Sequence, residues 1–495
     1  MNALEPLLMR DVRTLTHHSL QEFARLCSER LQAGDRLLTL FGRSHADDHP
    51  DGVIVTAVLQ PEAGELCVLR ASAQRGDHYP SITCSYPGAQ IFERELWEQT
   101  GLHPDGHPWL KPVRFEGVRQ QHMADYPFFK VRGQEVHEVG VGPIHAGVIE
   151  PGHFRFMCLG EQVHHLEIQL GYQHRGVEKL LLSRPPLALA PLVESICGDS
   201  CIAYTWAYCA AVEALSDSPV SPEVETVRGV ALEMERVAMH LAALNGLATD
   251  IAFLQGGATY GRLRTAIINA SMRMSGSRFG RAWLRPGGVR GLTDAQRLDL
   301  VQTLTALAKD IAQVNELMLT SKSVQARFQG TGVVSTKAAQ ELGLVGLVAR
   351  ASGVALDTRT RLPGALHDAS PLPLLTESSG DCWARMKLRM REIDSSVAWL
   401  LKILGNAALD LRTGITPIGQ ALHADTLCVS LREGARGPVA QVLETSAQGN
   451  LVHYKVQDPS LPNWFGLALA VRDNGISDFP ICNKSFDLSY CGNDL

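Results

Sequence analysis

The segment from Gly142 to Lys179 holds the densest group of side chains that could transfer protons or contact a cofactor. It contains five histidines, four glutamates, two arginines and several glycines. Histidine changes its charge between about pH 5 and 8, and glycine lets the backbone approach a ligand closely. A short strand of a protein core needs none of these groups. The segment is therefore the first candidate for a functional site.

A small α/β unit is expected at residues 1–115, ahead of this segment. Apolar residues recur at helical spacing over 20–31, and the sequence ERELWEQTG predicts a short helix that ends at Gly101. Three strands are expected at 36–43, 52–60 and 65–73.

One large, mainly helical domain is expected at residues 142–495. The polar and aromatic residues 116–141 are expected to connect it to the small unit. Helices are expected at 186–216, 220–254, 292–318 and 383–411, and strands near 153–160 and 452–456. The sequence therefore predicts an α+β protein.

The small unit carries a string of residues that resembles the signature of the 30-kDa subunit of respiratory complex I. The matching residues are Tyr79, Pro80, Ser81, Ala89, Glu93, Arg94, Glu95, Trp97, Gly101, His107 and Pro108. The resemblance implies that residues 1–115 form a domain of the complex I 30-kDa type.

Several strings of the large domain follow the order of another family. They include GPIH, LGYQHRGVEK, VRGVALEMERVAMHL, ARASGVALDTR and REGARGPV. They resemble the large subunit of group 4 nickel–iron hydrogenases, such as hydrogenase-4, and the 49-kDa subunit of complex I. The resemblance implies a fused 30-kDa/49-kDa-like subunit in the peripheral arm of a membrane-bound, ion-pumping oxidoreductase.

The ligand set for a nickel–iron centre is incomplete in this chain. Such a centre needs four soft thiolates, and the family supplies them as two CxxC pairs. Aligned on the family, cysteine stands only at the first position of each pair, at Cys197 and Cys482. Serine stands at the second position, at Ser200 and Ser485. Because a neutral hydroxyl is a hard oxygen ligand, we expect no working nickel–iron centre; Cys197 and Cys482 would be ligands only if a metal is bound.

The resemblance also implies catalytic roles for residues outside the metal positions. Glu150 matches the active-site glutamate of the hydrogenases, and we expect it to transfer protons. The other residues expected to pass charge displacement toward the membrane subunits are His153, Asp357 and Arg359.

Three further residues are expected to face cofactors. By resemblance, His174 and Arg175 should face the terminal 4Fe–4S cluster of a neighbouring small subunit, where a cation raises the cluster's potential. His145 lies in GPIH, which matches the complex I family, but the AGVIEPGHFRF that follows is of the hydrogenase-4 type. Whether a quinone binds therefore stays open.

Composition narrows the partners and the location. The net charge is −6, from 46 basic and 52 acidic residues, and without a long basic run we expect no nucleic-acid partner. No signal-peptide order and no stretch of about 18 uncharged apolar residues is present. The eleven cysteines then favour reduced thiols in a cytosolic compartment. We expect a cytoplasmic chain, held at the inner face of the cell membrane by an iron–sulfur small subunit and antiporter-like membrane subunits.

The leading hypothesis is a subunit that couples electron transfer at the neighbouring cluster to proton movement, without a working nickel–iron site. Two alternatives stay open. One is a hydrogenase large subunit with an altered ligand set, in which Cys201 and Cys491 replace the missing thiolates. The other is a coupling scaffold without catalysis. No G-x-G-x-x-G fingerprint follows a strand, so any NADH oxidation is expected in another subunit.

Overall fold

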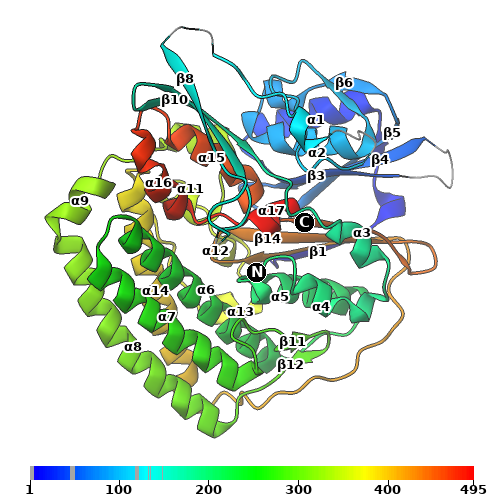
Figure 1. Ribbon diagram of the computed structural model, residues 1–495. Coiled ribbons are helices and arrows are strands. Elements are labelled where there is room, and N and C mark those ends of the chain that lie inside the picture. Colours follow the sequence, from blue (N-terminus) through cyan, green and yellow to red (C-terminus); the bar gives the residue numbers. More distant parts are fainter. Residues whose placement is uncertain (1–4, 45–50, 118–121, 132, 134, 148) are drawn as a thin grey trace.

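The computed structural model describes residues 5–44, 51–117, 122–131, 133, 135–147 and 149–495. The chain forms a small mixed unit and a larger, mainly helical unit, and a β-sheet lies at the boundary between them (Figure 1). The predicted α+β class is confirmed.

The small unit consists of a four-stranded sheet in the order β2-β5-β4-β3, two helices and a short parallel strand pair. Its elements are β2 (His17–His18), α1 (Leu20–Gln32), β3 (Arg36–Ser44), β4 (Gly52–Gln60), β5 (Cys67–Gln74), β6 (His78–Pro80), α2 (Gln90–Thr100) and β7 (His103–Asp105). The side chain of Ser19 caps the start of α1, and Gly101, at φ +81°, ends α2. The predicted helices and strands of this unit are confirmed to within a few residues.

A buried carboxylate holds the loop after β6. Glu93 of α2 accepts hydrogen bonds from the backbone N–H groups of Ile82 and Thr83, each at 2.9 Å. It also accepts from the hydroxyls of Ser81 (2.6 Å) and Thr83 (2.5 Å). A buried carboxylate is costly unless its oxygens are hydrogen-bonded, and these bonds satisfy both oxygens. The ERE part of the signature therefore holds the loop that begins at its YPS part.

Long helices form the body of the large unit, green to yellow in Figure 1. These are α5 (Cys201–Leu215), α6 (Pro222–Asp250), α7 (Leu254–Ser275), α8 (Asp294–Thr320) and α14 (Cys382–Gly405). Shorter helices are α3 (Val177–Leu182), α4 (Ala190–Val193), α9 (Lys322–Phe328), α10 (Thr336–Glu341), α11 (Gly346–Ala351), α12 (Thr358–Arg361), α13 (Gly364–Ala369), α15 (Ser460–Ala470), α16 (Phe479–Phe486) and α17 (Tyr490–Asp494). In the described part of the chain, no helix combines the length and the apolar character needed to cross a bilayer.

The single helix predicted at 186–216 is interrupted. Its first half holds a 3-10 turn at Pro186–Ala188 and the short α4, and α5 starts only at Cys201, after a loop. The carboxylate of Glu235 on α6 accepts hydrogen bonds from the N–H of Ile202 and of the residue after it, at 2.7 and 3.3 Å. In a continuous helix these N–H groups would bond to carbonyls of the preceding turn, so the carboxylate fixes the helix start here. The predicted helices at 220–254 and 292–318 are confirmed, and the one at 383–411 ends at Gly405.

An antiparallel sheet in the order β1-β13-β14-β15 lies between the two units. Its strands are β1 (Leu7–Asp11), β13 (Thr426–Glu433), β14 (Pro438–Thr445) and β15 (Leu451–Gln457). Strand β15 confirms the strand predicted near 452–456. The sequence missed β13 and β14, which are buried on both faces and carry charges such as Arg432 and Glu444, so they lack the alternating pattern of a half-buried strand.

Strand β1 comes from the first residues of the chain but pairs with β13, where Leu7 lies opposite Ser430. The predicted domain division at 1–115, 116–141 and 142–495 stays a prediction, and β1 crosses it. A second sheet, in the order β10-β9-β8, consists of β8 (Val136–Val141), β9 (His153–Leu159) and β10 (Gln162–Gln169). Strand β9 confirms the strand predicted near 153–160. The short pair β11 (Leu284–Arg285) and β12 (Gly288–Val289) completes the strands of the described residues.

Buried ion pairs join the two units. Glu95 of α2 pairs with Arg114 and with the Lys455 Nζ of β15, the latter at 2.6 Å. Arg70 of β5 pairs with Glu444 of β14. Removing one partner of a buried pair leaves an uncompensated charge, so these contacts hold the small unit in one orientation on the sheet.

Candidate functional site

The loop before α5 and the C-terminal helix α17 bring two cysteines together. Cys197 and Cys491 share a hydrogen bond, and the Ser489 Oγ lies 3.2 Å from the sulfur of Cys197 and 3.5 Å from that of Cys491. The Arg436 guanidinium lies 3.7 Å from the Cys197 sulfur and pairs with Asp199 at 2.8 Å. The hydrogen bond to Cys491 and burial raise the pKa of the Cys197 thiol, and the same hydrogen bond lowers the pKa of Cys491. We call these five residues the thiol cluster.

The other predicted ligand, Cys482, belongs to a different pair. It lies on α16 beside Cys382 of α14, and both side chains are buried. Ser485 Oγ accepts a hydrogen bond from Arg385 Nε at 2.8 Å and lies 3.5 Å from the Cys382 sulfur. Burial opposes ionisation of Cys382, yet the hydrogen bond with Cys482 and the Arg385 charge lower its pKa to about 6. The structure therefore places Cys482 with Cys382 and not in the cluster that holds Cys197.

The donors around Cys197 differ from those of a nickel–iron centre. The thiol cluster offers two sulfurs and the Ser489 hydroxyl, and Ser200 instead contacts Glu235 at 3.4 Å. Within the described ranges, neither Cys197 nor Cys482 belongs to a group of three His, Cys, Asp or Glu side chains close enough to share an ion. Because nickel and iron in such centres are held by four soft thiolates, the residues present here do not fit the group.

Two histidines tie together the ends of the loop between β8 and β9. His145 Nε2 is hydrogen-bonded to the carbonyl oxygen of Gly152 at 2.9 Å, and His153 Nδ1 to that of Gly142 at 3.1 Å. A Cβ at Gly142, where φ is +89°, would lie 2.1 Å from the Gly152 oxygen, so only glycine fits there. The structure thus gives His145 and His153 a part in the shape of the loop.

The half-buried Glu150 of this loop acts on the thiol cluster. Burial raises the pKa of Tyr490 to about 12, and the charge of Glu150 adds to this effect. The same charge acts on the neighbouring Cys491, opposing the hydrogen bond that lowers its pKa. Among the predicted catalytic residues, Glu150 is therefore the one whose charge acts on the thiol cluster.

His174 and Arg175 lie between the C-terminus and the loop that carries Cys197. His174 Nδ1 is hydrogen-bonded to the carbonyl oxygen of Asp494 at 2.8 Å, and its Nε2 lies 3.2 Å from Glu116. Burial acts against protonation, but these partners raise the pKa of His174. The exposed Arg175 donates to the carbonyls of residues 195 and 196 at 2.8 and 3.0 Å. Arg175 thus supports the Cys197 loop and also faces solvent, whereas His174 holds the C-terminal segment against Glu116.

Asp357 and Arg359 belong to a network of buried charges inside the helical body. Asp357 pairs with Arg359 at 2.6 Å and with Arg350 at 3.4 Å. Arg359 lies 3.2 Å from Glu233, which pairs with Arg236 at 3.0 Å. Burial opposes ionisation of Asp357, but the Arg359 and Arg350 guanidiniums hold its pKa well below the usual range. These buried groups are therefore charged and paired, as burial requires.

The network continues from Arg350 toward α16. Arg350 pairs with Glu392 at 2.7 Å, Glu392 with His240 at 2.8 Å, and His240 Nδ1 lies 3.2 Å from Arg389. Burial lowers the pKa of His240 to about 4, so its ring is neutral at pH 7. We call this set the charge row, which consists of Arg236, Glu233, Arg359, Asp357, Arg350, Glu392, His240 and Arg389.

Helix α16 connects the charge row to the thiol cluster. Arg389 donates to the carbonyl oxygen of Ser485 at 2.8 Å, and Arg436 donates to that of Asp487 at 2.5 Å. Against burial, the charges of both arginines help to lower the pKa of the Asp487 carboxyl. The charged groups therefore form a series that runs from Arg436 of the thiol cluster to Arg359 in the charge row.

Glu235 of α6 lies beside the thiol cluster and titrates near neutral pH. Burial raises its pKa to about 8, although the backbone N–H groups at the start of α5 act in the other direction. The neighbouring Asp199 charge adds to the rise. Glu235 is therefore mostly protonated at pH 7, and a small change in the local field would change its charge.

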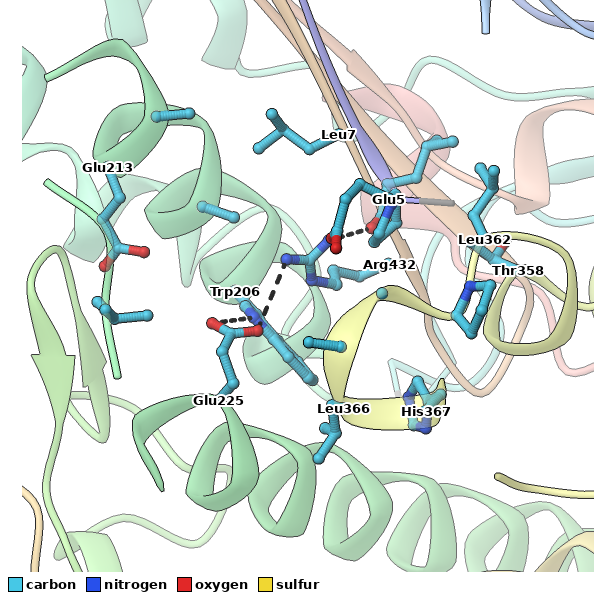
Figure 2. A pocket seen from close by; sticks show the side chains of 18 of the residues that line it. Glu5, Leu7, Trp206, Glu213, Glu225, Thr358, Leu362, Leu366, His367 and Arg432 are labelled. Atoms are coloured by element: carbon cyan, nitrogen blue, oxygen red, sulfur yellow. Dashed lines mark hydrogen bonds and ion pairs between the residues drawn. The ribbon is translucent and has the colours of Figure 1, made fainter. Parts of the chain in front are cut away.

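A cavity of about 540 Å³ lies at the far end of the charge row, where Arg359 and Thr358 form part of its wall. Figure 2 shows Arg432 beside the ring of Trp206, and the guanidinium lies 4.8 Å from the ring centroid. The indole N–H of Trp206 donates to Glu225 at 3.3 Å. His367 also lines the cavity, and burial lowers its pKa to about 4. A cavity of this size with apolar walls and a few charged groups suits a small organic molecule.

Sequence reasoning missed several of these residues. The terminal pair was predicted on α16, with Cys491 only as an alternative ligand, whereas Ser489 and Cys491, which lie near Cys197, belong to the start of α17. Arg436 and Glu235 lie in the strings REGARGPV and EMERVAMH among other charged residues, so residue type alone does not single them out. Nothing in the sequence pairs these residues with one another.

Two family models match the chain. Residues 14–129 match the model described as the 30 Kd subunit of respiratory-chain NADH dehydrogenase, and residues 250–416 match its 49 Kd subunit. Fold, site and models thus define a chain that combines two kinds of oxidoreductase subunit.

Similar proteins support the same conclusion. Hydrogenase-4 component G of Escherichia coli strain K12 is 27% identical over 461 residues, which cover 88% of this chain and 80% of that protein. Formate hydrogenlyase subunit 5 of the same strain is 26% identical over 466 residues, covering 88% and 81%. An NADH-quinone oxidoreductase subunit from Dehalococcoides mccartyi is 30% identical over 356 residues, covering 71% and 96%. The chain belongs to the family of complex I 30-kDa/49-kDa-type subunits that includes these hydrogenase components, and the predicted family is confirmed.

Proposed function

We propose that the chain is a peripheral-arm subunit of a membrane-bound, ion-pumping oxidoreductase related to hydrogenase-4 and NADH-quinone oxidoreductase. In this proposal it couples electron transfer at a 4Fe–4S cluster of an adjacent small subunit to proton movement. The observation that carries the proposal is the charge row, which links the thiol cluster near Glu150 to the cavity beside Arg359 through successive ion pairs and hydrogen bonds.

The chemistry follows from how buried groups respond to an added charge. The cluster of the small subunit would supply one-electron steps near His174 and Arg175. A unit charge about 10 Å away changes the energy of an ionisable group by about 1.7 kcal/mol at an effective dielectric constant of about 20, which shifts its pKa by about one unit. Near pH 8, where Glu235 is about half protonated, it would take up part of a proton on reduction and release it on reoxidation. The paired charges of the row would relay the change toward Asp357 and Arg359.

The proposal includes no working nickel–iron centre in this chain. The support is the donor set of the thiol cluster, in which a hydroxyl lies between two sulfurs and Arg436 adds a positive charge near Cys197. The partners proposed are an iron–sulfur small subunit and antiporter-like membrane subunits, which would hold the chain at the cytoplasmic face of the membrane. A quinone is a candidate acceptor within the assembled complex.

The decisive experiment measures protons moved per electron by the purified complex in sealed vesicles. Asp357→Asn removes a charge from the row, and we expect the ratio to fall by at least half while electron transfer stays within about twofold. Glu377→Gln is the matched control, because Glu377 pairs with Lys387 and Arg391 outside the row. Glu235→Gln provides a second variant should Asp357→Asn assemble poorly. An unchanged ratio in whichever of these two variants assembles contradicts the proposal.

A second candidate is a hydrogenase large subunit with an altered ligand set, and the contact between Cys197 and Cys491 favours it. It predicts stoichiometric nickel in the purified complex and loss of hydrogen uptake in Cys197→Ala and Cys482→Ala. A nickel-free complex that still transfers electrons removes this candidate. If Glu150→Gln and His174→Ala leave electron transfer and proton movement unchanged, the chain acts instead as a scaffold.

A further inference from the structure

A group of potential metal ligands lies on the small unit, apart from the thiol cluster and the charge row. His78 of β6 and His103 of β7 are register partners in a parallel strand pair, and Asp105 follows His103 by two residues. Side chains two residues apart on a strand point to the same face, so all three lie on one surface. Figure 1 shows β6 on the side of the small unit that faces away from the helical body. Across the described ranges, this is the one group of three His, Cys, Asp or Glu side chains whose donor atoms lie within 4.8 Å of one another.

The donor atoms already converge. His78 Nδ1 lies 2.8 Å and His103 Nδ1 lies 3.2 Å from the same oxygen of Asp105. The two imidazole rings are stacked, with centroids 4.7 Å apart. Donors on a tetrahedral zinc ion are about 3.3 Å from one another, since zinc–nitrogen bonds are about 2.0–2.1 Å. The observed spacing therefore needs only small side-chain rotations to admit an ion.

The backbone that carries these ligands is held firmly. Tyr79, which follows His78 on β6, is buried. Ser81, two residues further on, donates a hydrogen bond to Glu93. Backbone hydrogen bonds from His103 N to Asp77 O (2.8 Å) and from Ser81 N to Asp105 O (3.0 Å) link the two strands. A site on rigid strands loses less freedom when it binds an ion than a site on a mobile loop.

We propose that His78, His103 and Asp105 form a binding site for a divalent transition ion such as Zn²⁺. Two imidazoles and one carboxylate are ligands that zinc, nickel and cobalt accept, whereas calcium and magnesium need more oxygen donors. The exposure of all three side chains leaves the fourth position to water or to a group of another molecule.

Equilibrium dialysis of the full chain against about 10 µM free Zn²⁺, a level suited to micromolar affinity, tests the proposal. We expect the unaltered chain to bind one more equivalent than His78→Ala/His103→Ala. The matched control is His137→Ala/His164→Ala, which removes two other exposed histidines and should keep that equivalent. Zinc bound by any of the eleven cysteines is common to all three proteins and cancels in the comparison.

Asp105→Asn provides a second variant that keeps both imidazoles. We expect it to weaken binding at the site by about tenfold or more, since it replaces an anionic ligand. Zinc should also raise the Tm of the unaltered chain more than that of His78→Ala/His103→Ala. Equal equivalents in these two proteins, or equal rises in Tm, overturn the proposal. All substituted side chains are partly or fully exposed, so the variants should fold.

Discussion

Replacing Glu235 by glutamine tests whether this buried carboxyl is protonated at neutral pH. Glutamine keeps the shape and one acceptor oxygen of the acid but cannot ionise. Its NH2 group meets one of the two N–H donors at the start of α5, a cost that does not vary with pH. The wild-type pKa rises from 4.5 in the unfolded chain to about 8 in the fold because of burial. Between these values the folded chain holds a proton that the unfolded chain has lost, so wild-type stability decreases as pH rises from 4.5 to 8. The glutamine variant lacks this loss.

The size of the effect follows from the shift. pH 7 lies 2.5 units above the ordinary pKa of 4.5. At about 1.4 kcal/mol per unit, the wild-type chain has therefore lost about 3 kcal/mol of stability at pH 7. The full shift of 3.5 units corresponds to about 5 kcal/mol above pH 8. Relaxation around the charge reduces both figures, so we expect the stability of Glu235→Gln relative to wild type to rise by about 2 kcal/mol between pH 4.5 and pH 7. This change corresponds to a relative Tm rise of about 2 °C in a chain of this length.

The assay is the Tm of wild type and variant, measured every half unit between pH 4.5 and 9. The difference should increase with pH and level off near the pKa of about 8. Glu233→Gln, two residues away on α6, is the matched control with the opposite sign. Burial opposes ionisation of Glu233, but its arginine partners lower its pKa to about 2. Its stabilising charge is therefore present above pH 4.5 and is lost only as pH falls toward 2. Its variant should be less stable by a constant amount across the range. A difference for Glu235→Gln that does not vary with pH refutes the reasoning.

Three further variants test the packing. Glu93→Ala should lower stability by about 3 kcal/mol, seen in Tm, because it leaves several buried donors without an acceptor. Lys455→Met should cost about 3 kcal/mol, because Glu95 loses one of its two buried partners, and should speed proteolysis within the 116–141 connector. Gly332→Ala should cost about 3 kcal/mol, because the added Cβ, at φ +66°, would lie 2.7 Å from a cysteine sulfur. Gly330→Ala, at φ +75° with open space around it, is its control and should cost about 1 kcal/mol.

Each of these expectations has a contrary result. An unchanged Tm for Glu93→Ala would mean that water satisfies the freed donors. A connector in Lys455→Met that resists protease as well as in wild type would mean that the interface does not depend on this ion pair. If Gly332→Ala and Gly330→Ala lower stability equally, backbone strain explains the whole effect. The close approach of the added Cβ to the cysteine sulfur would then contribute nothing.

Local patterns predicted the small unit well because its elements carry strong local signals. Helix α1 shows the helical spacing of apolar residues, and β3, β4 and β5 show strand composition. Strands β13 and β14 were missed because their apolar residues are interrupted by charged residues whose partners lie far away in the chain. The start of α5 depends on Glu235 of another helix, which no local pattern reports.

The candidate site was predictable in its members more than in its geometry. Glu150 and Cys197 were both expected at the site; Cys197 is part of the thiol cluster and the charge of Glu150 acts on Cys491, while their catalytic and ligand roles stay predictions. Cys482 was expected beside Cys197, but its three-residue spacing to Ser485 lies on α16, where it faces α14. The spacing of residues along the chain does not determine whether α16 or α17 contributes to the site around Cys197. It also does not determine which cysteines lie next to each other.

Strand β1 has a consequence for how the molecule is made. Its partner β13 is synthesised only after more than four hundred further residues have left the ribosome, so the boundary sheet cannot close before then. Until then β1 has no strand to pair with. A chain stopped before β13 would therefore lack the sheet that lies between the two units.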